Sequence, residues 1–213
     1  MYVNKKYPAL RLLQEINLQI QRHGIKINDG VIVDATLVES NARPRKKVIV
    51  ETEPVGDDEI PGIPTYQASE LIIEESKGPN GRWVKKGLKS THGYKSHVMV
   101  DKDHGLIQAL EVTPANVHDD HMLMPLIESV DLTKETDVLA DKGYCSQKNE
   151  NSLAKHNREV SKERYRIERS FGSLKKYFGW DRSIYMGLKK TKDYLCMGAI
   201  AFNPKRSLKI LRS

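Results

Sequence analysis

The chain has 213 residues with 38% hydrophobic content, which is enough for one domain with a buried core and argues against a disordered chain. No apolar run approaches the length of a membrane-spanning helix, and residues 1–6 lack the apolar core of a signal peptide. We therefore expect a soluble, cytoplasmic protein without a membrane partner. Cys145 and Cys196 have no partner at metal-site spacing, which argues against structural zinc and a disulfide scaffold.

The net charge of +7 is divided unevenly along the chain. Residues 161–213 contain 14 Lys and Arg against 4 Asp and Glu, a net charge of +10, which leaves −3 for residues 1–160. An acidic body with a basic end predicts a carboxylate-lined site beside a surface that binds a polyanion. A solvated basic tail would carry the same charge, but apolar residues such as Ile167, Phe171 and Leu174 within this stretch argue against a tail.

The first part of the chain predicts a helix, a buried strand and an insertion. Apolar residues recur at helical spacing over residues 9–22. Residues 30–38 are rich in β-branched side chains and predict a buried strand, in which Asp34 is the one carboxylate. Residues 39–90 carry repeated Pro and Gly and blocks of opposite charge, so we expect an irregular insertion or long loop within a single domain that spans residues 1–213.

Strand and helix patterns alternate through the rest of the chain. The predicted elements are a hairpin over 94–101 and 106–113, a helix opened by Asn116 or His118, a strand over 138–140, a helix near 148–155, a helix over 162–178 and a helix over 188–202 that ends near Pro204. This order of elements predicts an α/β fold with a mixed sheet.

Three carboxylates stand out by their positions: Asp34 and Asp141 on predicted strands, and Glu168 on a predicted helix. A phosphoryl-transfer site with two Mg²⁺ or Mn²⁺ ions needs oxygen ligands on rigid elements, with the ions about 3.5–4 Å apart. Each residue also has a simpler interpretation. Asp34 could pair with an arginine, Asp141 could begin a turn, and Glu168 could be a solvated helix residue.

The helical positions around Glu168 favour a functional role for it. At 100° per residue, Arg164, Glu168 and Lys175 fall within about 40° of one another around the helix axis. Arg164 could then orient the carboxylate, and Lys175 could hold a DNA phosphate near the metal ions. A salt-bridge stripe on the helix surface would give the same spacing.

Five segments occur in a recognisable order: VIVDATLV around Asp34, GYKSHVMVD with GLIQALEVTPANVHDD, VLADKGY around Asp141, RYRIERSFGSLKKYFGW around Glu168, and AIAFNPKRS near the end. Together they resemble the DDE transposases of bacterial insertion sequences, in the superfamily of insertion-sequence families four and five. The resemblance covers nearly the whole chain. It implies an RNase H-like fold, an enzyme that cleaves and joins DNA at element ends and target, and Asp34, Asp141 and Glu168 as the catalytic, metal-binding triad. The predicted DNA-binding residues are Arg164, Lys175, Lys176 and Lys142.

The chain departs from the family pattern in three places. Ser161 stands where the signature has a tyrosine, the N-terminal DNA-binding region is expected to be missing, and the stretch between Asp141 and Glu168 is shorter than in relatives. We therefore expect impaired end-specific cleavage with retained non-specific DNA binding. Two alternatives stay open: an inactive remnant that only binds DNA, and a stand-alone RNase H-like nuclease. The oligomeric state, including a homo-oligomer, is left open.

Several histidines have two interpretations. His118, Asp119 and His121 are spaced as a metal site would need, but a helix-opening or DNA-positioning role is favoured. His97 lies on a predicted strand beside the core and is interpreted as a packed residue rather than a catalytic one.

Aromatic residues near basic ones suggest contacts with DNA. Trp83 could stack on an unpaired base or anchor the insertion to the core. Tyr165, Tyr177 and Trp180 alternate with Lys and Arg, which suits a DNA-facing surface, although some of them must belong to the core.

Overall fold

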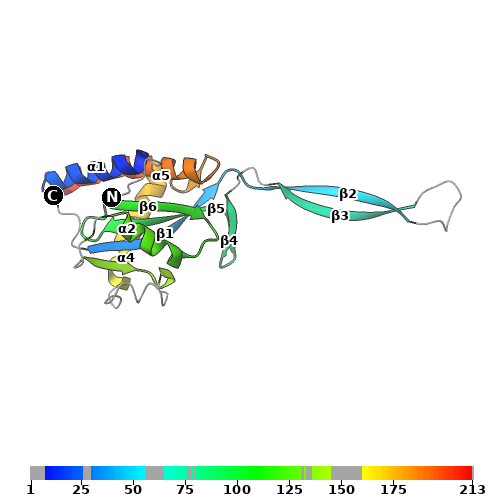
Figure 1. Ribbon diagram of the computed structural model, residues 1–213, viewed down its shortest axis with the longest axis horizontal. Helices are drawn as coiled ribbons and strands as arrows, with labels where there is room; N and C mark the ends of the chain where they lie inside the picture. Colours follow the sequence, from blue (N-terminus) through cyan, green and yellow to red (C-terminus); the bar gives the residue numbers. More distant parts are fainter. Residues whose placement is uncertain are drawn as a thin grey trace.

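A mixed β-sheet forms the centre of the molecule (Figure 1). The computed structural model describes residues 8–25, 30–55, 65–75, 78, 80–130, 132, 136–144 and 160–212. The helices are α1 (Pro8–Arg22), η1 (Asp119–Met122), α2 (Leu123–Glu128), η2 (Lys142–Tyr144), α4 (Val160–Phe178) and α5 (Leu188–Ile210). The strands are β1 (Gly30–Ser40), β2 (Arg45–Val55), β3 (Thr65–Glu75), β4 (Arg82–Lys86), β5 (Lys89–Asp101), β6 (Ile107–Pro114), β7 (Asp137–Ala140) and β8 (Arg182–Ser183).

Strand β1 lies between antiparallel and parallel neighbours. It pairs antiparallel with β5, which in turn pairs antiparallel with β4 and β6. On its other edge β1 pairs in parallel with β7 at its beginning and with β8 at its end. The predicted hairpin is therefore confirmed as β5–β6, and the mixed sheet with flanking helices agrees with the predicted RNase H-like α/β fold.

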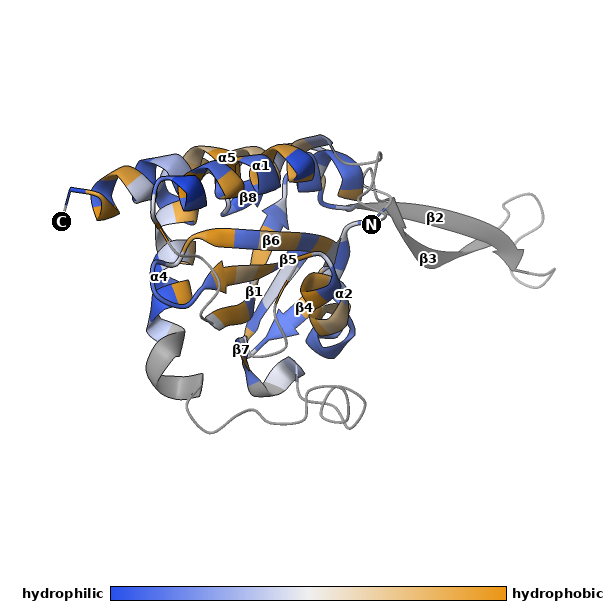
Figure 2. Ribbon diagram, turned by 60° about the vertical axis from the view of Figure 1, so that its left-hand side comes forward, coloured by the Kyte–Doolittle hydropathy of each residue, from blue (hydrophilic) through white to orange (hydrophobic). Residues whose placement is uncertain are grey.

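The two faces of the sheet bury separate apolar clusters. On one face, Ile32 of β1 and Val98 of β5 pack with Ile167 and Leu174 of α4 and with residues of α1 and α5. On the other face, β1, β5 and β7 pack against α2. Figure 2 shows apolar residues along β6 and on α2. Because side chains alternate along a strand, even-numbered residues of β1 point toward α4 and odd-numbered ones toward α2.

Buried asparagines connect α1 and α5 to β6. The Asn203 side chain accepts a hydrogen bond from the Ile107 backbone N–H at 2.9 Å and donates to the Ile107 carbonyl oxygen at 2.8 Å. It also donates to Asn17 Oδ1 at 2.7 Å, and Asn17 donates to the same Ile107 carbonyl oxygen at 2.9 Å. These bonds satisfy polar groups that burial would otherwise leave unpaired, and they fix both helices on the sheet.

The prediction of an irregular insertion over residues 39–90 needs correction. Within this range β2 and β3 pair antiparallel over 11 residues each, as a two-stranded sheet that projects from the body in Figure 1. Strand β4 and the start of β5 also lie within it. Val, Ile and Thr in these segments favour extended backbone, a signal that the recurring Pro and Gly obscured.

The predicted end of the last helix near Pro204 was also wrong. Helix α5 continues to Ile210 with Pro204 inside it. Proline removes one helical hydrogen bond, but tertiary contacts hold the helix on both sides of it. Before the proline, Asn203 is bonded to β6, and after it the Arg206 guanidinium group donates to the His104 carbonyl oxygen in the turn between β5 and β6. The helix predicted near 148–155 lies outside the described residues.

Within the described part of the chain, no helix is long and apolar enough to cross a membrane.

Candidate active site

Parallel pairing of β1 with β7 places two predicted catalytic aspartates side by side. Val33 of β1 is in register with Ala140 of β7, and the next residues along the two strands are Asp34 and Asp141. Asp34 lies within β1, where only 8% of it is exposed, and Asp141 is half-buried at the end of β7. Burial of a carboxylate destabilises the fold unless hydrogen bonds or cations compensate for the lost solvation. The Ala35 backbone N–H supplies one such bond to Asp34 Oδ1 at 2.7 Å.

The third predicted residue, Glu168, is on the helix that covers the Asp34 face of the sheet. Helix α4 contacts β1, and its Ile167, Phe171 and Leu174 are buried in the cluster that contains Ile32. Glu168 follows Ile167 and is exposed. Among the residues that the structure describes, no group of three or more His, Cys, Asp or Glu is arranged to hold a metal ion. The structure thus brings the two aspartates together, and Glu168 stands on the adjacent helix outside such a group.

The predicted DNA-binding lysines of α4 differ in their surroundings. Lys175 is half-buried, and burial is the main cause that lowers the pKa of its ammonium group; Asp181 opposes this shift, and the positive charges of Lys86 and Lys89 add to it. Lys176 is exposed, with its ammonium group 5.2 Å from the centre of the Tyr177 ring. The backbones of Arg164 and Lys142 lie in α4 and η2, and their side chains are outside the described set.

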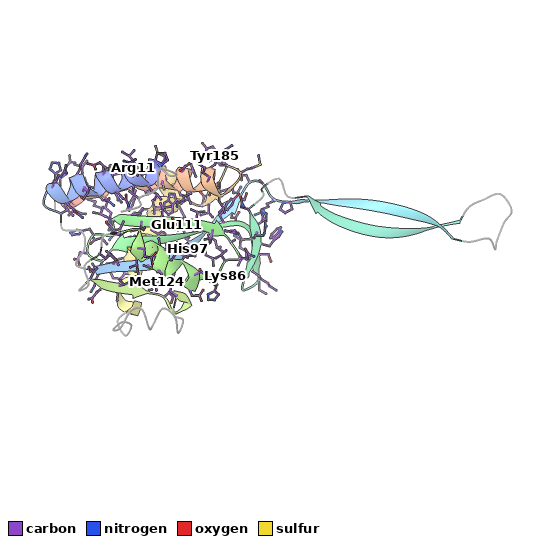
Figure 3. The ribbon with its side chains drawn as sticks, in the orientation of Figure 1. Arg11, Lys86, His97, Glu111, Met124 and Tyr185 are labelled. Carbon is purple, nitrogen blue, oxygen red and sulfur yellow. The ribbon has the colours of Figure 1, made fainter. Side chains whose placement is uncertain are left out.

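A buried polar network lies directly behind the Asp141 turn. His97 of β5, labelled in Figure 3, is on the sheet face that α2 covers and is wholly buried. Its Nδ1 is 3.1 Å from the Tyr144 hydroxyl, and its Nε2 is 3.0 Å from Thr113 Oγ1. Tyr144 ends η2, and its backbone N–H donates to the Asp141 carbonyl oxygen at 2.9 Å. The network therefore connects the sheet to the turn that begins at Asp141.

Asp119 completes this network at the start of η1. Its Oδ1 accepts a hydrogen bond from Lys95 Nζ at 2.7 Å and is 3.9 Å from His97 Nδ1. Burial lowers the pKa of His97 to about 4, with Asp119 opposing the shift, so His97 is neutral at pH 7. Burial raises the pKa of Tyr144, and the negative charges of Asp119, Asp34 and Asp141 raise it further. The phenol is therefore neutral and available to donate a hydrogen bond toward the imidazole.

Sequence reasoning had missed this network, although it had noted some of its members. The expectation that His97 is packed agrees with its burial, and Asp119 was noted only as part of a histidine-rich run. The flanking histidines turn outward: His118 Nδ1 is 2.8 Å from Asp120 Oδ1, and His121 Nε2 is 3.5 Å from the same atom. The spacing of Tyr144 three residues after Asp141 is the sequence signal that could have identified the turn.

The aromatic candidates divide between surface and core. Trp180 is wholly buried, whereas Tyr165 and Tyr177 are exposed. Trp83 is partly exposed and packs its ring edge-on against His92, with ring centres 5.2 Å apart. Trp83 thus contacts the next strand of its own hairpin and still presents part of its ring to solvent.

Comparison with known proteins places the chain in a family. The transposase DDE domain family matches residues 26–160. Among curated proteins, the transposase for insertion sequence element IS1106 of Neisseria meningitidis serogroup B is 33% identical over 217 residues, which cover 90% of this chain and 70% of that protein. No solved structure matches the chain. With adjacent aspartates on a mixed sheet and these two matches, the chain belongs to the DDE transposases of insertion sequences.

Proposed function

We propose that this chain acts on DNA through Asp34, Asp141 and Glu168, and that it catalyses cleavage and strand transfer of an insertion sequence. The observation that carries the proposal is the register of β1 and β7, which sets Asp34 and Asp141 at neighbouring positions under α4. Hydrolysis of a phosphodiester at the element's end would free a 3′-hydroxyl group. That hydroxyl would then attack a target phosphodiester, forming one P–O bond as another breaks.

The donor set fits divalent cations of the Mg²⁺ type. Asp34 and Asp141 supply carboxylate oxygens, the ligands that Mg²⁺ and Mn²⁺ prefer. Their negative charges also help to raise the pKa of the nearby Tyr144, which supports a local excess of negative charge. When bound, a pair of such ions stabilises the charge on the attacking and leaving oxygens of the phosphoryl group. We expect two ions, with Asp34 and Asp141 as ligands from the sheet.

Glu168 is the proposed third ligand. Position favours it, because it follows the buried Ile167 on the helix that packs over Ile32 and is therefore beside the covered face. Its exposure means that the side chain has room to change rotamer. We propose that Glu168 turns toward the aspartates when cations and DNA bind, because the cations relieve the repulsion between three carboxylates.

Basic residues of α4 are proposed to hold the DNA backbone. Lys175 lies two turns after Glu168 on the same stripe of the helix, and Lys176 follows it at the surface. Phosphate contacts of this kind position the duplex and carry no sequence information. Arg164 and Lys142 are proposed to contribute from the start of α4 and from the turn after Asp141.

DNA binding without cleavage is the second candidate function. The exposure of Glu168, outside any metal-binding group of the described residues, favours it. Incubating the 213-residue protein with DNA that carries the element's ends, in Mg²⁺ or Mn²⁺, separates the candidates. The proposed enzyme should give nicked and joined products, in low yield at the element's ends because of the three departures from the family pattern, and Asp34→Asn and Asp141→Asn should abolish these products. Binding without any product, at every metal concentration, would favour the second candidate.

A further inference from the structure

The β4–β5 hairpin extends past the rest of the sheet as a two-stranded ribbon. Its pairs run from Arg82↔Gly93 to Lys86↔Lys89. The pairing of β5 with β1 stops at Gly93, and its pairing with β6 stops at Tyr94. In the described part of the chain, residues 89–92 therefore pair with β4 alone. Gly87 permits the tight turn because it adopts a φ of +60°, a value that other residues rarely adopt.

This ribbon is exposed and positively charged. Every residue from 82 to 90 is exposed except Val84, which is half-buried, and Leu88 at the tip has no contact that hides it from solvent. The stretch RWVKKGLKS contains four cations, Arg82, Lys85, Lys86 and Lys89, and no carboxylate. It is a basic segment within the first 160 residues, whose net charge is negative. If this hairpin were only a solvated loop, it would require neither paired strands nor four cations without a carboxylate, so both features favour a binding surface.

The positive charge continues from the ribbon to neighbouring elements. Lys86 and Lys89 both help to lower the pKa of Lys175, so the ribbon and the end of α4 share one electrostatic environment. Glu39 of β1 lies at the base of the ribbon. Its carboxylate is 3.1 Å from Lys89 Nζ and 3.2 Å from each of the guanidinium groups of Arg43 and Arg182. One carboxylate facing three cations leaves the surface positive.

We propose that the β4–β5 ribbon enters the major groove of a DNA duplex, and this inference rests on the proposed function because it assumes DNA as the substrate. The major groove, about 12 Å wide, admits a two-stranded β-ribbon. Lys85 and Lys86 are adjacent in β4 and so point to opposite faces of the ribbon, which suits contacts with the phosphates on both sides of the groove. Leu88 then meets the base edges, where thymine methyl groups offer apolar contact.

Binding of the full chain to a labelled duplex, measured by fluorescence anisotropy over a range of salt without divalent metal, tests the phosphate contacts. Lys85→Ala/Lys86→Ala should flatten the slope of log affinity against log salt by about two units, one for each lost contact. The matched control is Arg11→Ala/Arg22→Ala, which removes two exposed cations from α1; Figure 3 labels Arg11 and Lys86 in separate parts of the molecule. The control should leave the slope unchanged.

A second pair of variants tests the groove. Leu88→Glu places a carboxylate at the ribbon tip and should weaken binding at least about tenfold, whereas Leu12→Glu on the exposed side of α1 should not. In the wild-type complex, guanine N7 atoms, which face the major groove, should be protected from methylation, and Lys85→Ala/Lys86→Ala should lose that protection. Thermal unfolding of each variant controls for folding, and these exposed positions should leave the midpoint unchanged.

The outcomes separate the two proposals. If the wild type fails to bind DNA at any salt concentration, the proposed function itself fails. If it binds and the ribbon variants behave like the α1 controls, the ribbon does not contact DNA and only the present inference is overturned. If the ribbon variants lose affinity but guanine N7 atoms stay reactive in the wild-type complex, the ribbon binds DNA outside the major groove, and insertion into that groove is overturned.

Discussion

Replacing Tyr144 with Phe removes one hydroxyl group from a side chain that is 1% exposed. The ring and its edge-on contact with His97, at 6.1 Å between ring centres, remain. The His97 Nδ1 atom loses its partner at 3.1 Å, and no solvent can replace that partner because His97 is wholly buried. An unpaired buried group of this kind costs about 1–3 kcal/mol, so we expect a loss of that size in the free energy of unfolding.

The same substitution should weaken metal binding, because it loosens the turn that begins at Asp141. The Tyr144 backbone N–H is bonded to the Asp141 carbonyl oxygen, and the hydroxyl holds the ring against β5. Loss of a supporting interaction behind a metal ligand lowers affinity by about 10–100-fold. Urea unfolding measures the stability change, and calorimetric titration with Mn²⁺ measures the affinity.

Tyr94→Phe is the matched control. Tyr94 is also wholly buried, and its hydroxyl oxygen accepts a hydrogen bond from the Gly187 backbone N–H at 2.9 Å, on the sheet face opposite His97. It should lower stability similarly and leave Mn²⁺ affinity unchanged. Equal Mn²⁺ affinity in the wild type and Tyr144→Phe would refute the reasoning, as would a stability loss below about 0.5 kcal/mol.

Three other predictions concern pH, reactivity and packing. Folding lowers the pKa of His97 from 6.5 to about 4, so the free energy of unfolding is greatest above pH 6.5 and falls by up to about 3 kcal/mol as the pH drops toward 4. Urea unfolding measured over this pH range should show the decline, and His97→Gln should flatten it. Burial raises the pKa of the Cys196 thiol to about 12, so a thiol reagent at pH 8 should label a Cys145→Ser variant only after the protein unfolds. Rapid labelling of the native variant would contradict the burial of Cys196. Gly93→Ala would place a methyl group 2.2 Å from a β1 carbonyl oxygen and should lower the free energy of unfolding in urea by at least about 2 kcal/mol. Gly172→Ala has open space in α4 and should raise the free energy of unfolding by about 0.5–1 kcal/mol. Equal effects of the two substitutions would contradict the pairing of β1 with β5.

Local pattern was sufficient for the elements that position the aspartates. Strand 30–38, the hairpin and the strand before Asp141 were predicted because β-branched runs favour buried strands. Periodicity also predicted α1 and α4. Pairing between β1 and β7 joins residues more than a hundred positions apart, so no local signal contains it. Only the resemblance to a family indicated that Asp34 and Asp141 would meet.

Tertiary contacts explain what local pattern missed. Helix α5 continues through Pro204 because Asn203 and Arg206 bond it to β6 and to the turn between β5 and β6, and a rule based on proline alone could not include those bonds. The network of His97 and Tyr144 combines residues 47 positions apart in sequence. The place of Glu168 relative to the aspartates was predicted from helical spacing and resemblance, and it stays a prediction. The stretch between Asp141 and α4 that bears on it lies largely outside the described residues.

Calorimetric titration of the wild type with Mn²⁺, beside Asp34→Asn, Asp141→Asn and Glu168→Gln, tests the central claim most directly. We predict that the wild type binds the cation and that either aspartate substitution abolishes binding, because both side chains supply oxygen ligands. Glu168→Gln should lower the affinity or the number of ions bound. Wild-type affinity and stoichiometry in Asp34→Asn and Asp141→Asn would contradict the claim that these adjacent carboxylates form the metal site.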